Sequence, residues 1–194
     1  MGGNAALAAA KVAAGVAFAS QAIVADGIHS ASDLITDAAV FAGLGRSAQP
    51  ADHEHPYGHR RIATLVALFV GAALLVTAVG IAYGGITALR RPLQVPVQPA
   101  VPLAVALASV ALKEGLFRLT RRVGRQCGDL SVRANAWHHR TDAFSSLAAA
   151  AGLAGVLAGG EAWHFLDPVT AVRLAAFVAL AAVRIVRDAA GELV

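Results

Sequence analysis

The chain has 194 residues, a length that suits one domain, and 57% of them are hydrophobic while only 14% are charged. Soluble globular chains carry roughly 25% charged residues, because a polar surface must cover the apolar core. The composition therefore excludes a soluble domain and predicts a membrane-embedded protein. The net charge of +4 does not indicate nucleic-acid binding, because the arginines lie between apolar stretches, as membrane topology signals do.

Six apolar segments follow one another, which predicts an all-α fold: an integral membrane bundle of six transmembrane helices forming one domain, residues 1–194. The third segment contains no charged residue and is longer than the roughly 20 residues that cross a bilayer. The predicted helices run over about 5–19, 22–44, 62–89, 101–117, 130–157 and 168–186. Pro56 and Pro92 are expected to separate helices, since proline cannot continue one.

The first segment ends on Ala17-Phe18-Ala19, which looks like the cleavage site of a secretory signal peptide. Lys11 interrupts its apolar core, and no basic residue precedes that core, as a signal peptide requires. We therefore expect a retained, short first helix. A cleaved or poorly inserted end is the alternative.

The arginines also predict orientation. If six spans alternate, one side of the membrane receives Arg46, Arg60, Arg61, Arg121, Arg122, Arg125, Arg184 and Arg187. Cytoplasmic connections carry an excess of Lys and Arg, so both termini are predicted to lie in the cytoplasm, with the chain in the inner membrane of the cell. Arg90 and Arg91 fall on the opposite side and weaken this prediction.

Two predicted helices carry polar stripes that hydrocarbon disfavours, which makes each ionisable residue a candidate for function. Both stripes are spaced by three, four and four residues, so each lies on one helix face. The second helix contributes Asp26, His29, Asp33 and Asp37. The fifth helix contributes Asn135, His138, Asp142 and Ser146.

A His and an Asp four residues apart point the same way from a helix, so the pairs His29–Asp33 and His138–Asp142 can converge. Two imidazoles and two carboxylates are the donor set of a tetrahedral Zn²⁺ site. The alternative is that these groups only hydrogen-bond helix to helix. That alternative does not explain the HxxxD spacing on both helices, or carboxylates where Ser or Asn would cost less.

A second group of metal-binding residues lies between the second and third helices. Asp52, His55 and His59 fall within eight residues, with Pro56 and Gly58 shaping the turn. Such a cluster can form a surface metal site, although exposed histidines also occur without metal. Its place beside the end of the second helix favours a metal site.

These stretches resemble the cation diffusion facilitator family of divalent-metal transporters. The resemblance rests on Ala25 to Asp33, Pro50 to His59 and Ala136 to Asp142, with Lys11 ahead of them, and it covers nearly the whole chain. It implies a cation-efflux type transmembrane domain of six helices. The family's usual cytoplasmic C-terminal domain is expected to be absent, because the chain stops where the sixth helix ends.

The resemblance also assigns roles to the polar residues. It implies a transport site made of His29, Asp33, His138 and Asp142, and the paired HxxxD pattern is that of zinc-preferring members. A second, loop site is implied at Asp52, His55 and His59. Family members work as homodimers that exchange metal for protons. Three further polar residues of the stripes, Asp26, Asp37 and Asn135, are predicted to be accessory ligands.

The predicted function is a secondary active transporter rather than an enzyme: a Zn²⁺/H⁺ antiporter that exports zinc from the cytoplasm. Fe²⁺, Mn²⁺, Cd²⁺ and Co²⁺ are alternative substrates. Zinc binding requires neutral imidazole and ionised carboxylate, so protons and metal compete for the site. Two alternatives stay open, an inactive or assembly subunit and an intramembrane metalloenzyme with a metal-bound water. The sequence contains no HExxH motif to support the enzyme.

Overall fold

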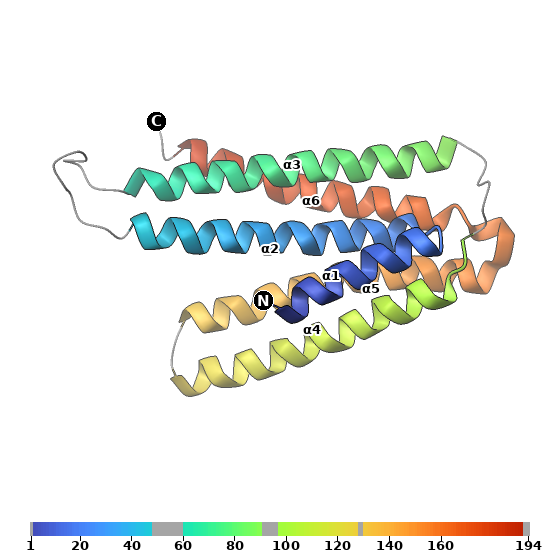
Figure 1. The fold of residues 1–194 in the computed structure, drawn as a ribbon, viewed down its shortest axis with the longest axis horizontal. Helices are drawn as coiled ribbons and strands as arrows, with labels where there is room; N and C mark the ends of the chain where they lie inside the picture. The colour runs from blue at the N-terminus through green and yellow to red at the C-terminus, as the bar shows by residue number, and fades with distance from the viewer. Residues whose placement is uncertain (1, 48–59, 91–96, 128–129, 192–194) are drawn as a thin grey trace.

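The computed structural model describes residues 2–47, 60–90, 97–127 and 130–191. These residues form six α-helices and one short 3₁₀ helix, η1, and no strand (Figure 1). The helices are α1 (Gly2–Ala17), α2 (Gln21–Ser47), α3 (Arg60–Arg90), α4 (Ala100–Cys127), α5 (Leu130–Gly159), η1 (Gly160–Trp163) and α6 (Leu166–Gly191). The all-α prediction is confirmed.

Some helix ends differ from the sequence prediction. The predicted end of the fourth helix at Phe117 is wrong, because α4 continues to Cys127. The apolar stretch stops there, but arginine is a good helix former, so the helix runs on through its arginines. The sixth helix starts at Leu166 rather than at Pro168, because proline is tolerated in the first turn of a helix.

The helices pack as neighbouring pairs around α2. The helix α3 packs along α6, α4 packs along α5, and α1 packs on α2. Figure 1 shows α2 between the α3–α6 pair on one side and α1, α4 and α5 on the other. Consistent with this, α2 contacts α1, α3, α5 and α6. The helix with the first polar stripe is therefore central in the bundle.

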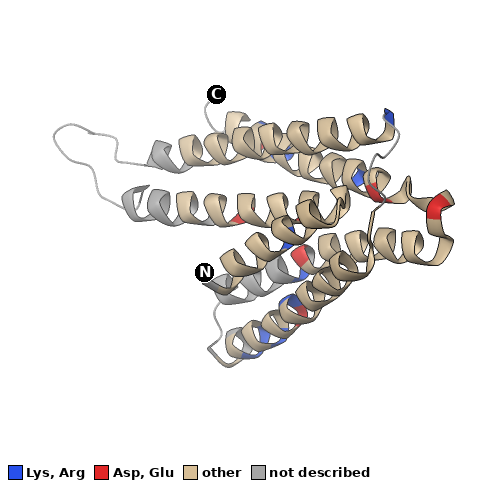
Figure 2. Cartoon of the chain, turned by 45° about the vertical axis from the view of Figure 1, so that its right-hand side comes forward, with Lys and Arg blue, Asp and Glu red and all other residues tan. Residues whose placement is uncertain are grey.

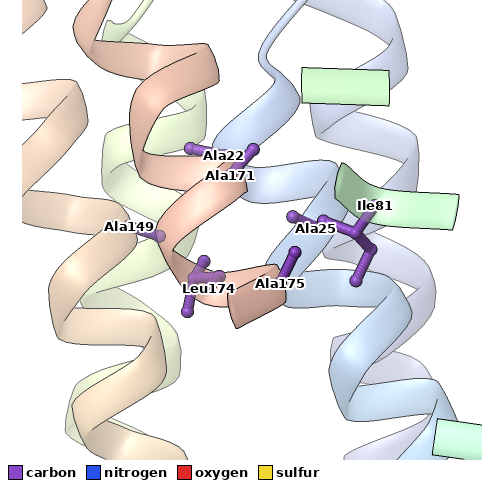
Figure 3. Close-up of a cluster of buried hydrophobic side chains, with 7 residues drawn as sticks. All are labelled: Ala22, Ala25, Ile81, Ala149, Ala171, Leu174 and Ala175. Carbon is purple, nitrogen blue, oxygen red and sulfur yellow. The ribbon is translucent and has the colours of Figure 1, made fainter. Parts of the chain in front are cut away.

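Small residues allow these helices to approach closely. One buried cluster joins α2, α3, α5 and α6 and consists mostly of alanines (Figure 3). Its members are Ala22, Ala25, Ile81, Ala149, Ala171, Leu174 and Ala175. At Gly85 of α3, an added Cβ would lie 2.7 Å from Val172 Cγ2 and 3.1 Å from the Pro168 carbonyl oxygen of α6. Close backbone approach of this kind is the usual packing mode of helices in membranes.

A carboxylate from α6 fixes the start of α2. Asp167 is fully buried and accepts hydrogen bonds from the Gln21 and Ala22 backbone N–H groups at 2.6 and 3.3 Å. It also accepts one from the Ser20 hydroxyl at 2.6 Å, and Ser20 in turn caps the Ile23 N–H at 3.3 Å. A negative group at a helix N-terminus satisfies donors that have no partner within the helix.

The exterior of the bundle suits lipid. Within the described residues, four helical stretches are long and apolar enough to cross a membrane: Thr64–Arg90, Ala100–Val123, Asp142–Trp163 and Leu166–Gly191. The helix α2 has 27 residues, but its polar stripe lowers its hydropathy, and the apolar stretch of α1 is shorter. Large apolar side chains such as Phe69, Val76 and Tyr83 are exposed. Figure 2 shows long uncharged stretches of ribbon, with a few charged residues in the middle of the bundle.

Candidate metal centre

Three of the predicted transport-site residues converge between α2 and α5. His29 and Asp33 come from α2 and Asp142 from α5, and each offers a ligand atom within 4.8 Å of the other two. His29 and Asp33 lie one helical turn apart, with His29 Nδ1 3.7 Å from Asp33 Oδ1. The tertiary structure therefore brings residues more than a hundred positions apart to one point.

The environment of this cluster is mostly dehydrated. The side chains of His29 and Asp33 are 12% and 15% exposed, and Asp142 is buried. A cavity of about 10 Å³ lies beside Asp33 and Asp142, with Ser30, Leu34 and Lys113 in its wall. That volume is about what one water-sized occupant needs.

The donor set fits a divalent metal ion. Among the described residues, His29 Nδ1 has no hydrogen-bond partner. Asp33 Oδ1 lies 3.7 Å away, which is too long for a hydrogen bond. That nitrogen is therefore able to coordinate a metal ion. One imidazole and two carboxylates provide three ligands for Zn²⁺ or a related first-row ion, which leaves a position for a fourth.

The other predicted ligands are described only in part or not at all. His138 and Asn135 belong to α5 and Asp37 belongs to α2, but their side chains lie outside the described part of the structure. The loop site, comprising Asp52, His55 and His59, also lies outside the described residues. His138 lies one helical turn before Asp142 in the sequence, and its role as a ligand stays a prediction.

A buried ion pair lies next to the cluster. Lys11 Nζ of α1 is 2.8 Å from Asp26 Oδ2 of α2, and both side chains are fully buried. Lys11 also donates to the hydroxyls of Ser30 at 3.1 Å and Ser146 at 2.9 Å, while the Ser145 hydroxyl donates to Asp26 Oδ1 at 3.0 Å. These bonds join α1, α2 and α5. The accessory metal role of Asp26 stays a prediction.

A second buried lysine contacts a candidate ligand directly. Lys113 Nζ of α4 lies 3.4 Å from Asp142 Oδ2 and 3.4 Å from the Ser30 hydroxyl, and its side chain is only 4% exposed. Lys113 is not among the functional residues predicted from the sequence. An ionisable side chain inside the predicted fourth span was the signal available.

Comparison with known proteins connects this geometry to a family. The family model described as the cation efflux transmembrane domain matches residues 2–194. The chain belongs to the cation efflux family. This confirms the resemblance to the cation diffusion facilitators and, together with the apolar spans, makes the chain an integral membrane protein.

Several curated proteins are similar to this cation efflux domain. Metal tolerance protein C1 of Arabidopsis thaliana is 35% identical over 97% of this chain and 42% of the relative. Metal tolerance protein 2 of Oryza sativa subsp. japonica is 31% identical over 95% of this chain and 53% of the relative. Manganese efflux system protein MneP of Bacillus subtilis is 35% identical over 84% of this chain and 54% of the relative. The chain thus spans about half the length of the curated relatives it matches.

Proposed function

We propose that this chain carries divalent metal ions across a membrane through a site formed by α2 and α5. The observation that supports it is the convergence of His29, Asp33 and Asp142, with ligand atoms within 4.8 Å, inside an apolar helix bundle. Ionisable groups are expensive in hydrocarbon, so a cluster of them indicates an ion pathway. We place His138 as the fourth ligand, one turn from Asp142.

We further propose Zn²⁺ as the main substrate, exported from the cytoplasm in exchange for protons. Imidazole nitrogen favours Zn²⁺ over Mn²⁺, whereas carboxylate and water suit Mn²⁺. Proton exchange follows from ligand chemistry, since protonated His and Asp cannot bind the metal. The relative from Bacillus subtilis is named a manganese efflux protein, which makes Mn²⁺ the competing substrate.

The proposal extends to assembly and orientation. We propose a homodimer in the inner membrane of the cell with cytoplasmic termini, so that the loop residues Asp52, His55 and His59 face the cytoplasm and form a second metal site there. Residue-specific crosslinking in native membranes tests the dimer, with serial dilution into lipid vesicles as control. Crosslinks that vanish on dilution within the bilayer would contradict a stable dimer.

Metal flux tests the function. The purified chain of 194 residues is reconstituted in proteoliposomes, and Zn²⁺ or Mn²⁺ uptake is measured with and without a pH gradient. We expect Zn²⁺ uptake that rises when the gradient drives protons in the opposite direction. An inactive subunit and an intramembrane metalloenzyme move no metal, so absence of flux from protein that binds Zn²⁺ would favour these alternatives.

A further inference from the structure

A buried ammonium group lies against one of the three converging ligands. Lys113 reaches from α4, which contributes none of the ligands proposed above, and its Nζ is 3.4 Å from Asp142 Oδ2. The residue is 3% exposed in a wall of the small cavity that Asp33 and Asp142 also line. A positive side chain therefore shares a carboxylate with the proposed metal site.

The other buried lysine, Lys11, pairs with a residue outside the three converging ligands. Lys11 is 2.8 Å from Asp26 Oδ2, so its charge is matched by a carboxylate outside the converging set. Both ammonium groups donate to the same Ser30 hydroxyl, Lys11 at 3.1 Å and Lys113 at 3.4 Å. Of the two, only Lys113 is balanced by one of the three converging residues, Asp142.

The shared carboxylate sets up a competition between two cations. An ammonium group has no lone pair with which to coordinate a metal ion, and it repels a divalent cation bound to the same carboxylate. The repulsion is strong where water is excluded, because little screening remains. Without metal, the same ammonium group supplies the positive counter-charge that a buried carboxylate such as Asp142 requires.

We propose that Lys113 is an internal competitor of the metal, holding Asp142 in the metal-free carrier and weakening metal binding enough for release. This inference rests on the proposed function, because it assigns Lys113 to the same site. The flexible four-carbon stem of lysine and the neighbouring Ser30 hydroxyl give the ammonium an alternative position when metal engages Asp142. Lys113 thereby sets the affinity of the site without being a ligand.

A purely structural role predicts different behaviour. If Lys113 only fastens α4 to α2 and α5, its removal loosens the site and weakens metal binding. If Lys113 competes, its neutral replacement Lys113→Gln binds metal more tightly and releases it more slowly. The replacement Lys113→Arg keeps the charge and can hold a carboxylate with two parallel hydrogen bonds, so it should weaken metal binding.

The test combines equilibrium binding of Zn²⁺ to the purified chain in detergent with Zn²⁺ flux in proteoliposomes. We expect Lys113→Gln to lower the dissociation constant about tenfold, the effect of removing one charge near the site, and to lower flux at saturating Zn²⁺. Lys113→Arg should raise the dissociation constant severalfold. Glu114→Gln is the matched control, since Glu114 pairs with Arg118 at 2.9 Å on the same helix, and it should bind and transport like wild type.

Unchanged or weaker Zn²⁺ binding by Lys113→Gln would overturn the inference. If the Gln variant does not fold, tighter Zn²⁺ binding by Lys113→Arg would overturn it instead. Asp142→Asn separates this result from the proposed function. If wild type binds and transports Zn²⁺, Asp142→Asn does neither, and Lys113→Gln behaves like wild type, only the role of Lys113 is refuted. If wild type neither binds nor transports Zn²⁺ or Mn²⁺, the proposed function fails and the inference fails with it.

Discussion

Lys11 and Asp26 form an ion pair of 2.8 Å in which both side chains are fully buried. The pair joins the first helix to the second, and hydroxyls of Ser30, Ser145 and Ser146 complete its hydrogen bonds. A buried pair is costly to break because the remaining charge has no counter-ion. Lys11, which interrupts the apolar pattern of the first helix, is therefore accounted for by a partner on the second.

Removing one member of this pair should destabilise the bundle. We expect Lys11→Met to lower the free energy of unfolding by about 3–5 kcal/mol, measured by reversible unfolding in detergent. The double variant Lys11→Met/Asp26→Leu should recover most of the loss, since it leaves no unpaired charge. Arg118→Ala is the control, because its pair with Glu114 is exposed and such pairs contribute less than about 1 kcal/mol. A double variant as unstable as the single one would contradict this account.

Loss of any transport-site ligand should abolish flux. We expect His29→Ala, Asp33→Ala, His138→Ala or Asp142→Ala to reduce Zn²⁺ uptake to background in proteoliposomes, because a tetrahedral site that lacks a ligand binds poorly. Each variant should still insert in the membrane and elute as a single species. His139→Ala, one position off the stripe, serves as the histidine control and should retain flux. Wild-type uptake by Asp142→Ala would refute the site.

The loop residues should affect the rate rather than the existence of transport. We expect the double variant His55→Ala/His59→Ala to slow Zn²⁺ uptake while leaving binding at the transport site, because the loop site is proposed to supply metal rather than to carry it. Asp52→Ala should behave alike. Comparison of initial rates with equilibrium Zn²⁺ binding makes the distinction. A loop variant as inactive as Asp142→Ala would mean that the loop site is as essential for transport as the site between α2 and α5.

Metal preference should depend on His29. Exchanging imidazole for carboxylate makes the site richer in oxygen, which favours Mn²⁺ over Zn²⁺. We therefore expect His29→Asp to lower Zn²⁺ flux while Mn²⁺ or Cd²⁺ flux becomes comparable or rises, in competition assays. His29→Asn matches Asp in size without its charge and should lose flux for every metal. An unchanged ranking of metals in His29→Asp would show that His29 does not set selectivity.

Asp167, which caps α2, should contribute more to stability than an exposed aspartate of its own helix. Asp167→Ala removes the acceptor for Gln21, Ala22 and Ser20, so we expect a loss of about 1–3 kcal/mol in unfolding free energy. Asp188→Ala, at an exposed position of the same helix, should change it by less than about 0.5 kcal/mol. Equal losses in the two variants would argue against a capping role.

Much of this architecture follows from the sequence alone. The low charge content and the apolar segments indicate a helical membrane protein, because only lipid tolerates such an exterior. The spacing of His29 with Asp33 places both on one face of a helix, because the helical repeat is local and independent of the rest of the fold. The end of the fourth helix was missed, since the edge of an apolar stretch marks where a helix leaves lipid and not where its hydrogen bonds stop.

The tertiary structure decided which polar groups meet. Asp142 reaches His29 and Asp33 because α5 packs beside α2, and Lys113 reaches Asp142 because α4 packs along α5. The stripe on α2 contains Asp26 and Asp33 at equivalent helical positions, yet Asp26 pairs with Lys11 while Asp33 lies with His29 and Asp142 in the candidate metal centre. Their different partners depend on which neighbouring helix lies opposite each turn, and that is set by packing across the bundle rather than by spacing along the chain.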